Sequence, residues 1–147
     1  MKERLNIYEN APKALEILIE MEKYISTFDI NIKLRELIKI RASQINKCAY
    51  CLEMHTIDAK KYGETEQRLN AIAAWEESPY FTDEERAALA FTEEVTRISE
   101  HGVKQNTFEN LKKYFSEKQI AQMIIVINQI NFWNRNAVTA KTLYKGH

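Results

Sequence analysis

The amino-acid sequence predicts an all-α protein that folds as one domain over residues 1–147. Three observations support this prediction. Apolar residues recur at three- and four-residue spacing along almost the whole chain, which is the pattern of amphipathic helices. Alternating runs of the kind that form half-buried strands do not occur in the sequence. With only 3 Gly and 2 Pro, the chain also has few residues that interrupt helices.

Capping and helix-breaking residues set the expected boundaries of the first helices. Pro12 favours the first turn of a helix, and Asn31 is a good N-cap for the next one. Gly63 readily adopts the left-handed conformation that closes many helices. The first three helices are therefore expected at residues 12–28, 31–45 and 48–62.

The second half of the chain contains two capping boxes, in which a hydroxyl residue is followed three positions later by Glu or Gln. They begin at Thr82 and Ser116, and Gly102 is expected to end the helix that Thr82 opens. Shorter helices are expected near residues 66–74 and 108–115. The domain should therefore contain about six to seven helices.

The last predicted helix is apolar on nearly every side. Besides its main stripe it carries four further apolar residues, namely Ile124, Ile125, Val126 and Phe132. A helix of this kind is usually buried on several sides. In so small a chain, part of that surface is expected to meet another subunit, so we expect a homo-oligomer, as a trimer or a hexamer.

The charge and hydropathy of the chain argue against two classes of partner. Lys plus Arg and Asp plus Glu are both 21, so the formal net charge is zero and no nucleic-acid-binding surface is indicated. The apolar run at residues 123–127 is far shorter than the ~20 residues of a membrane span. The first residues do not resemble a signal peptide. A cytoplasmic protein without a membrane or nucleic-acid partner is therefore expected.

Two cysteines, Cys48 and Cys51, give the strongest indication of function. In a reducing compartment such a pair is more often catalytic, redox-sensing or metal-binding than a structural disulfide. On one helix, Cys48, Cys51 and His55 would share a face. Lowering a thiol pKa of about 8.5 by roughly 1.5 units takes about 2 kcal/mol. A helix N-terminus supplies about 0.3–1 kcal/mol, so His55 is the expected additional partner.

The spacing of the cysteines also predicts the behaviour of a disulfide between them. On a regular helix their Cβ atoms would be about 5–6 Å apart. A relaxed disulfide needs about 3.5–4.5 Å. A bond between Cys48 and Cys51 is therefore expected to distort the first helical turn and to be easily reduced.

Glu36 is a candidate partner for His55. It lies twelve residues before Cys48, about 18 Å away along a straight helix. If the chain turns back near Asn46, however, an antiparallel hairpin would bring Glu36 and His55 to similar heights. The hypothesis requires that the two side chains lie on the same side of the domain.

Two simpler interpretations of the cysteines stay open. A structural zinc site usually has four nitrogen or sulfur ligands, and Cys48, Cys51 and His55 supply three. The two thiols could also pack as small apolar side chains. Redox chemistry is the preferred interpretation, with no metal and no cofactor expected.

The motif of Glu36, then Cys48-Ala49-Tyr50-Cys51 and His55 resembles the signature of the AhpD-like alkylhydroperoxidases, a branch of the carboxymuconolactone decarboxylase superfamily. Residues 37–46 resemble the helix that leads into the cysteines of this family, and residues 64–69 and 131–135 resemble stretches further on. The resemblance implies a helical domain with a central helix hairpin that carries the cysteines. Tyr50 stands where AhpD has a histidine, so the implied proton relay is shorter.

The resemblance also implies a peroxidase cycle. Cys51 would be the thiolate that attacks a hydroperoxide and becomes a sulfenic acid, and Cys48 would condense with it to a disulfide. Glu36 and His55 would form the relay that takes the proton from Cys51. A dithiol reductant protein, of the lipoyl or thioredoxin type, would restore the two thiols.

Two functional hypotheses follow from these observations. In the first, the protein is an enzyme that reduces hydroperoxides through the Cys51/Cys48 pair. In the second, it is a redox-responsive interaction module, whose disulfide switches assembly or partner binding without turnover. Peroxide consumption in the presence of a dithiol separates the two hypotheses.

Overall fold

The computed structural model describes residues 2–144, and this part of the chain contains helices and no strand. The all-α prediction is therefore confirmed, and each expected segment contains a helix. Nine α-helices are present in the described residues, more than expected, because α1 and α7 are single turns of four residues. The elements are α1 (Ile7–Asn10), α2 (Pro12–Ser26), α3 (Ile32–Ile45), α4 (Ala49–Lys61), α5 (Glu66–Ala71), the 3₁₀ helix η1 (Ile72–Ala74), α6 (Asp83–Thr96), α7 (Ile98–His101), α8 (Gln105–Leu111) and α9 (Glu117–Ala140).

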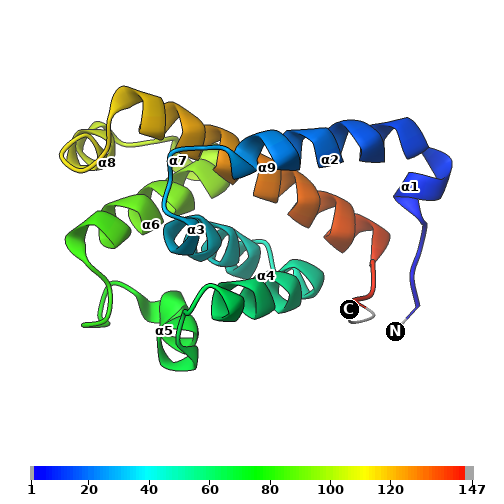
Figure 1. Ribbon diagram of the computed structural model, residues 1–147, viewed down its shortest axis with the longest axis horizontal. Coiled ribbons are helices and arrows are strands. Elements are labelled where there is room, and N and C mark those ends of the chain that lie inside the picture. Colours follow the sequence, from blue (N-terminus) through cyan, green and yellow to red (C-terminus); the bar gives the residue numbers. More distant parts are fainter. Residues whose placement is uncertain (1, 145–147) are drawn as a thin grey trace.

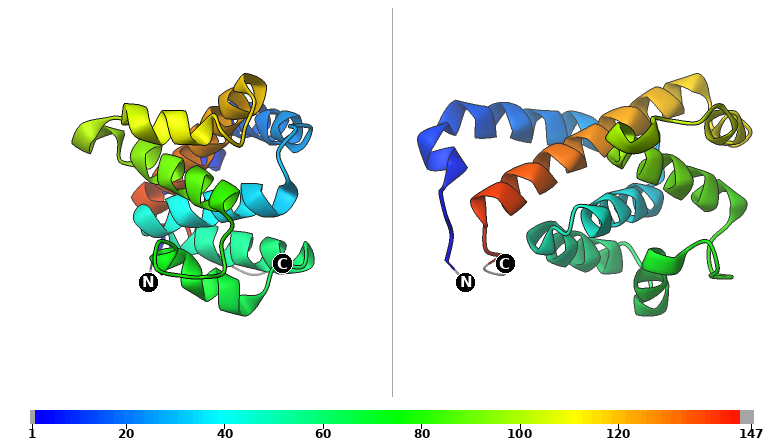
Figure 2. Two further views of the ribbon diagram at one scale, coloured as in Figure 1. Left: turned by 90° about the vertical axis from the view of Figure 1, so that its left-hand side faces the viewer. Right: turned by 180° about the vertical axis from the view of Figure 1, so that it is seen from behind.

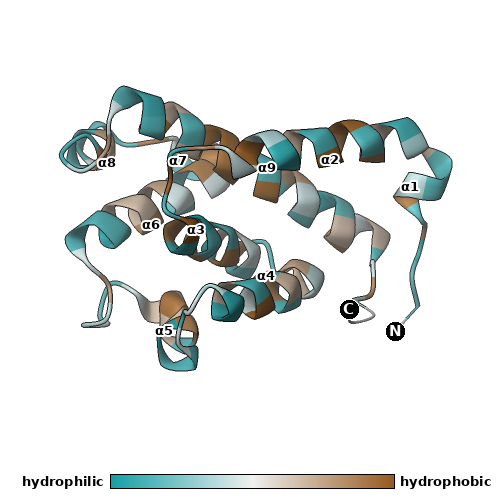
Figure 3. Ribbon diagram, in the orientation of Figure 1, coloured by the Kyte–Doolittle hydropathy of each residue, from teal (hydrophilic) through white to brown (hydrophobic). Residues whose placement is uncertain are grey.

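Helix α3 is the centre of the fold, with α4 on one side and α6 and α9 on the other (Figures 1 and 2). Its two sides belong to different parts of the core. Ile38 packs with residues of α2, α6 and α9, whereas Leu37 packs with residues of α5, η1 and α6. Figure 3 shows hydrophobic residues gathered along α3. Because neighbours cover this helix on all sides, its charged residues Arg35, Glu36 and Lys39 are buried as well.

Helices α3 and α4 form the antiparallel hairpin that the sequence predicted. The side chain of Asn31 caps α3 by accepting a hydrogen bond from the backbone N–H of Lys33, at 2.9 Å. At the other end the chain reverses through Lys47, which has a positive φ of 54°. The N–H of Cys48 then donates to the carbonyl oxygen of Ser43, at 3.0 Å. This tight turn places the start of α4 directly beside the end of α3.

Both predicted capping boxes are present, at Thr82 and at Ser116, each with its backbone and side-chain hydrogen bonds. The helix expected between Thr82 and Gly102 is interrupted, however. Arg97 has φ −101° and ψ 34°, so α6 ends before it and α7 forms a separate turn. No Gly or Pro marks this position in the sequence, so a pattern of helix-breaking residues could not locate the break.

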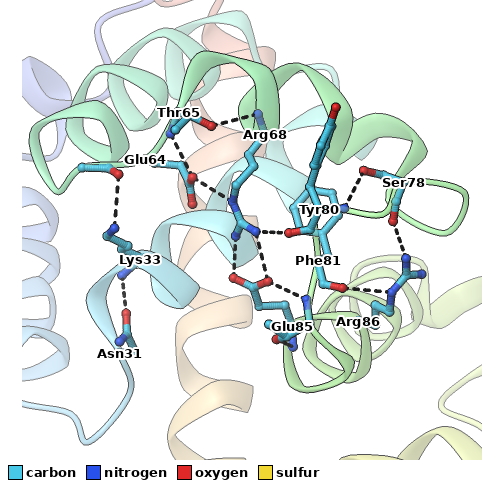
Figure 4. A network of polar contacts seen from close by, with 12 residues as sticks. Asn31, Lys33, Glu64, Thr65, Arg68, Ser78, Tyr80, Phe81, Glu85 and Arg86 are labelled. Carbon is cyan, nitrogen blue, oxygen red and sulfur yellow. Dashed lines mark hydrogen bonds and ion pairs between the residues drawn. The ribbon is translucent and has the colours of Figure 1, made fainter.

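A network of charged and aromatic residues holds the loop before α6 against the start of α5 (Figure 4). The Nε atom of Arg68 lies 2.8 Å from Glu64, and its Nη2 atom lies 2.5 Å from Glu85. Its guanidinium also donates to the carbonyl oxygen of Tyr80 and lies over the ring of Phe81, 4.9 Å from the centroid. We call these five residues the Arg68 clamp.

The outer surfaces of α2 and α9 carry exposed apolar side chains. On α2, Met21 is 38% exposed. On α9, Val126 belongs to the core, whereas Ile124, Ile125 and Phe132 are exposed. Within residues 2–144 no helix combines the length and the hydropathy that crossing a membrane requires.

Candidate active site

The two cysteines meet at the start of α4. Cys48 is the N-cap residue and has an extended backbone, with φ −90° and ψ 94°, whereas Cys51 lies in the first helical turn. Both thiols are free and buried, and their sulfur atoms are 2.6 Å apart. Cys48 therefore precedes the regular part of α4. The prediction of a strained disulfide assumed that both cysteines lie on a regular helix, and that assumption was wrong.

Hydrogen bonds within the pair lower the pKa of the Cys48 thiol to about 7. The largest cause is the hydrogen bond with the thiol of Cys51, whose sulfur lies 2.6 Å away. The backbone N–H of Cys51, 3.4 Å from that sulfur, and the side chain of Asn134 act in the same direction, whereas burial opposes them. The hydrogen bond to Cys48, together with burial and the charge on Cys48, raises the pKa of Cys51. The hydrogen bond between the thiols therefore favours one negative charge on the pair, with Cys48 as the more acidic thiol. The family resemblance implies a thiolate on Cys51.

A chain of side-chain amides, of which Asn131 and Asn134 are buried, fixes which atom of Asn134 faces the sulfurs. The Nδ2 atom of Asn131 donates to the carbonyl oxygen of Ile127, at 2.8 Å, and a carbonyl can only accept. The Oδ1 atom of Asn131 must then be an acceptor, and it receives a hydrogen bond from Asn46 Nδ2 at 2.8 Å. The same nitrogen donates to Asn134 Oδ1 at 2.9 Å. The amide nitrogen of Asn134 therefore points the other way.

That amide nitrogen has two hydrogens, and one of them goes to Ser43. The Ser43 hydroxyl donates to the carbonyl oxygen of Lys39 at 2.7 Å, so it accepts from Asn134 Nδ2 at 3.0 Å. The second hydrogen is available to the cysteines, and the Asn134 side chain lowers the pKa of both Cys48 and Cys51. Asn134 is thus a fixed donor that favours the thiolate form of the pair.

The hairpin brings Glu36 of α3 and His55 of α4 together, with Oε2 of Glu36 2.7 Å from Nδ1 of His55. Both side chains are buried. Because Nδ1 faces the carboxylate, Nε2 is the ring nitrogen left for other contacts. The ammonium of Lys39 lies 3.9 Å from Glu36 and 3.5 Å from Glu22, and the indole N–H of Trp133 donates to Glu22 at 2.7 Å. A line of alternating polar groups thus runs from the imidazole to α9.

A cavity of about 630 Å³ is enclosed by residues of α1, α2, α3, α4 and α9. Its size falls within the roughly 300–1,000 Å³ of small-molecule sites. Cys51, His55 and Glu36 line it, whereas Cys48 is not among its lining residues in the described chain. Cys51 is therefore the sulfur that a molecule in the cavity would meet. The lining also includes four aromatic side chains, Tyr8, Tyr50, Tyr62 and Trp133.

The structure thus gathers all four residues that the sequence singled out. Cys48 contacts Cys51, Glu36 contacts His55, and the cavity joins the two pairs through Cys51 and His55. Among the residues from 2 to 144, no group of three or more His, Cys, Asp or Glu side chains is arranged to hold a metal ion.

Three further polar residues of the site were missing from the prediction. Asn134 contacts the thiols, and Lys39 and Glu22 extend the contacts of Glu36. A signal for Asn134 exists in the sequence, because Asn131 and Asn134 follow one another at helical spacing on an otherwise apolar helix face. Buried polar groups of this kind need partners, so their presence indicates a specific network.

A cysteine pair beside a carboxylate–imidazole contact, carried on a central helix hairpin, defines a helical protein of the AhpD-like class. The model of the Carboxymuconolactone decarboxylase family matches residues 12–94, which is more than half of the chain. The protein therefore belongs to this family, as the sequence motif indicated.

Three similar proteins are 44%, 36% and 22% identical to this chain. "Uncharacterized protein YdfG" of Bacillus subtilis (strain 168) is 44% identical over 138 residues, which cover 94% of each chain. The structure of ATU0492 from Agrobacterium tumefaciens, a protein of unknown function suggested to be the antioxidant defence protein AhpD, is 36% identical with a TM-score of 0.95. That match covers 99% of this chain and 100% of ATU0492. The apo structure of the debrominase Bmp8 has a TM-score of 0.84 at 22% identity, covering 94% of this chain and 74% of Bmp8, and shares the fold.

Proposed function

We propose that the protein is a thiol-dependent peroxidase and disulfide oxidoreductase that reduces hydroperoxides through Cys51 and Cys48. The supporting observation is the arrangement of the two sulfurs, which are 2.6 Å apart. Of the two, Cys51 lines a cavity together with the Glu36–His55 pair. The likeness to ATU0492, suggested to be AhpD, supports the same class of activity.

The oxidation of the pair begins with one negative charge shared between the two sulfurs. When the remaining proton lies on Cys48, the charge is on Cys51. The Cys51 thiolate then forms a bond with the terminal oxygen of the hydroperoxide, and the O–O bond breaks. Sulfur is oxidised to a sulfenic acid and the peroxide is reduced to an alkoxide. The thiol proton lost on ionisation was taken up by Nε2 of His55, while Glu36 holds the other ring nitrogen. The alkoxide takes this proton back from His55 and leaves as the alcohol.

Condensation and reduction complete the cycle. The Cys48 thiol attacks the sulfenic sulfur, an S–S bond forms, and the hydroxyl group leaves with the thiol proton as water. A dithiol of the lipoyl-protein or thioredoxin type then supplies two electrons and two protons, and the thiols return. The net reaction converts one hydroperoxide and one dithiol into one alcohol, one water and one disulfide. We propose that the enzyme works in the cytoplasm as a trimer or hexamer.

Peroxide consumption under stopped-flow conditions tests the proposal, with cumene hydroperoxide as oxidant and excess dihydrolipoamide as reductant. The wild-type protein should turn over many times, Cys51→Ser should lose turnover, and Cys48→Ser should stop with a sulfenic acid on Cys51, visible by mass spectrometry. Slow oxidation without turnover would favour the redox-responsive interaction module instead. A sulfenic acid that forms only on Cys48, in the Cys51→Ser protein, would reverse the two roles.

A further inference from the structure

Arg35 is a buried cation on the wall of the cavity that contains Cys51. The residue is 6% exposed, and it lines the cavity. Its Nη1 atom donates to the backbone carbonyl oxygen of Ile25, at 2.8 Å, which is a neutral acceptor. No carboxylate in residues 2–144 lies within 4.0 Å of its guanidinium. A guanidinium has five N–H donors, so most of the hydrogen-bonding capacity of Arg35 is unused by these contacts.

Two nearby cations of α3, the buried Lys39 and the partly buried Arg41, do have acidic partners. Lys39, one turn further along α3, lies 3.9 Å from Glu36. Arg41 lies 2.7 Å from Glu93. Because an uncompensated buried charge is strongly unfavourable, Arg35 is an exception that calls for a partner from outside the chain. An anionic group in the cavity would supply that partner.

The acidic residues that line the cavity are mostly engaged with other cations. Glu22 and Glu36 both lie near Lys39, at 3.5 Å and 3.9 Å, and Glu36 also contacts an imidazole. Asp58 lies 2.9 Å from Lys61. These three carboxylates therefore do not neutralise Arg35.

Glu3, the fourth acidic residue of the lining, belongs to the opposite end of the cavity. The neighbouring residue, Arg4, donates its backbone N–H to the carbonyl oxygen of Ala140, at the end of α9. Arg35 instead contacts the last turn of α2 at Ile25. Helix α2 starts beside α1 and has 15 residues, which makes it about 22 Å long (Figures 1 and 2).

The position of Arg35 relative to the thiols follows from the helix hairpin. Lys33 of α3 reaches the carbonyl oxygen of Gly63, at 3.1 Å, and Glu36 reaches His55. Arg35 therefore lies beside the part of α4 that extends beyond His55. His55 itself is four residues after Cys51, or about 6 Å further along the helix. A ligand that contacts both the sulfur and the guanidinium would therefore carry a ring or a short carbon chain between its two polar ends.

We propose that Arg35 binds a carboxylate, so that the preferred substrate is an organic hydroperoxide with an apolar body and a carboxylate group. The apolar part would contact lining residues such as Leu15, Ile32 and Met54. A carboxylate accepts two parallel hydrogen bonds from a guanidinium, which fixes the orientation of the ligand. The hydroperoxide group of the substrate rests on the proposed peroxidase function. The binding of a carboxylate by Arg35 does not depend on it.

Matched ligands test the proposal in the reduced wild-type protein. Calorimetry should show that 4-isopropylbenzoate binds about tenfold more tightly than 4-isopropylbenzamide, its neutral analogue. The corresponding para-carboxylate of cumene hydroperoxide should have a kcat/KM about tenfold higher than that of the para-carboxamide. Arg35→Met should reduce both ratios to about one, whereas Arg41→Met, which removes a paired arginine, should keep both.

Each outcome decides one of the two proposals. Equal binding of the benzoate and the benzamide by the wild-type protein would overturn the role of Arg35, even if Arg35→Met failed to fold. A preference that persists in Arg35→Met, checked with Arg35→Gln, would overturn it as well. If no hydroperoxide is turned over while the benzoate binds preferentially, the peroxidase proposal fails and the anion site stands.

Discussion

The Arg68 clamp and the polar network around the cysteines are both built from buried and partly buried charged groups, but their charges are balanced differently. In the clamp, Arg68 has carboxylates at 2.8 Å and 2.5 Å and an aromatic ring beneath it. Around the cysteines, Arg35 has no acidic partner among the described residues, and a thiol of lowered pKa lies behind a cavity. The fully paired charges of the clamp hold the loop before α6 against α5. Incomplete pairing beside a cavity leaves groups available to a ligand.

Breaking the clamp should have the largest effect on stability. Arg68→Met leaves the buried carboxylate of Glu64 without its cation, so the free energy of unfolding should fall by about 3 kcal/mol. Urea denaturation monitored by circular dichroism measures this loss. Lys13→Met, which removes an exposed ion pair with Glu16, should change stability by less than about 1 kcal/mol. A loss from Arg68→Met as small as that control would show that the clamp is not structural.

A change at Glu36, in the network around the cysteines, is expected to lower activity. Glu36→Gln keeps the shape of the side chain but removes the charge that holds His55, so the peroxidase kcat should fall about 100-fold. Glu93→Gln is the matched control, because Glu93 also forms a partly buried ion pair but lies outside the cavity lining. It should affect stability and leave kcat unchanged. Equal rates for wild type and Glu36→Gln would remove Glu36 from the relay.

A smaller effect, on the thiol pKa, is expected from replacing Asn134. This residue lowers the pKa of both thiols and is not among the cavity-lining residues. Asn134→Ala removes one hydrogen bond to a charged sulfur, so the pKa of the Cys48 thiol should rise by about one unit. Thiolate absorbance near 240 nm, recorded against pH, reports the change. Thr96→Val is the control, because it removes only the hydrogen bond from Asn131 to Thr96 at the far end of the same amide chain. It should leave the pKa of the Cys48 thiol unchanged. Identical titrations for Asn134→Ala and wild type would contradict the assigned orientation of the amide.

The parts of the structure that the sequence predicted are those that depend on local interactions. Helix boundaries followed from caps such as Asn31 and Ser116, whose partners lie two and three residues away. The contact of Glu36 with His55 could be predicted because it needs only two helices and one turn between them. Local hydrogen bonding and hairpin geometry are therefore sufficient for this half of the site.

The parts that the sequence did not predict depend on distant residues. The lowered pKa of Cys48 involves Asn134, which α9 brings to the start of α4. The extended backbone of Cys48 arises from the turn at Lys47, and a helical pattern beginning at Cys48 does not reveal it. The cavity itself is formed by segments from both ends of the chain, including Tyr8 and Trp133. Only the tertiary structure brings these groups together.

Titration of the reduced thiols by their absorbance near 240 nm tests the central point most directly. One thiolate should form as the pH rises through about 7, because the hydrogen bonds of Cys51 and Asn134 lower the pKa of Cys48. In Cys48→Ser this transition should disappear, and in Cys51→Ala it should move towards the ordinary value of 9.0. A wild-type protein whose thiols titrate only near pH 9 would contradict the shared thiolate on which the proposed chemistry depends.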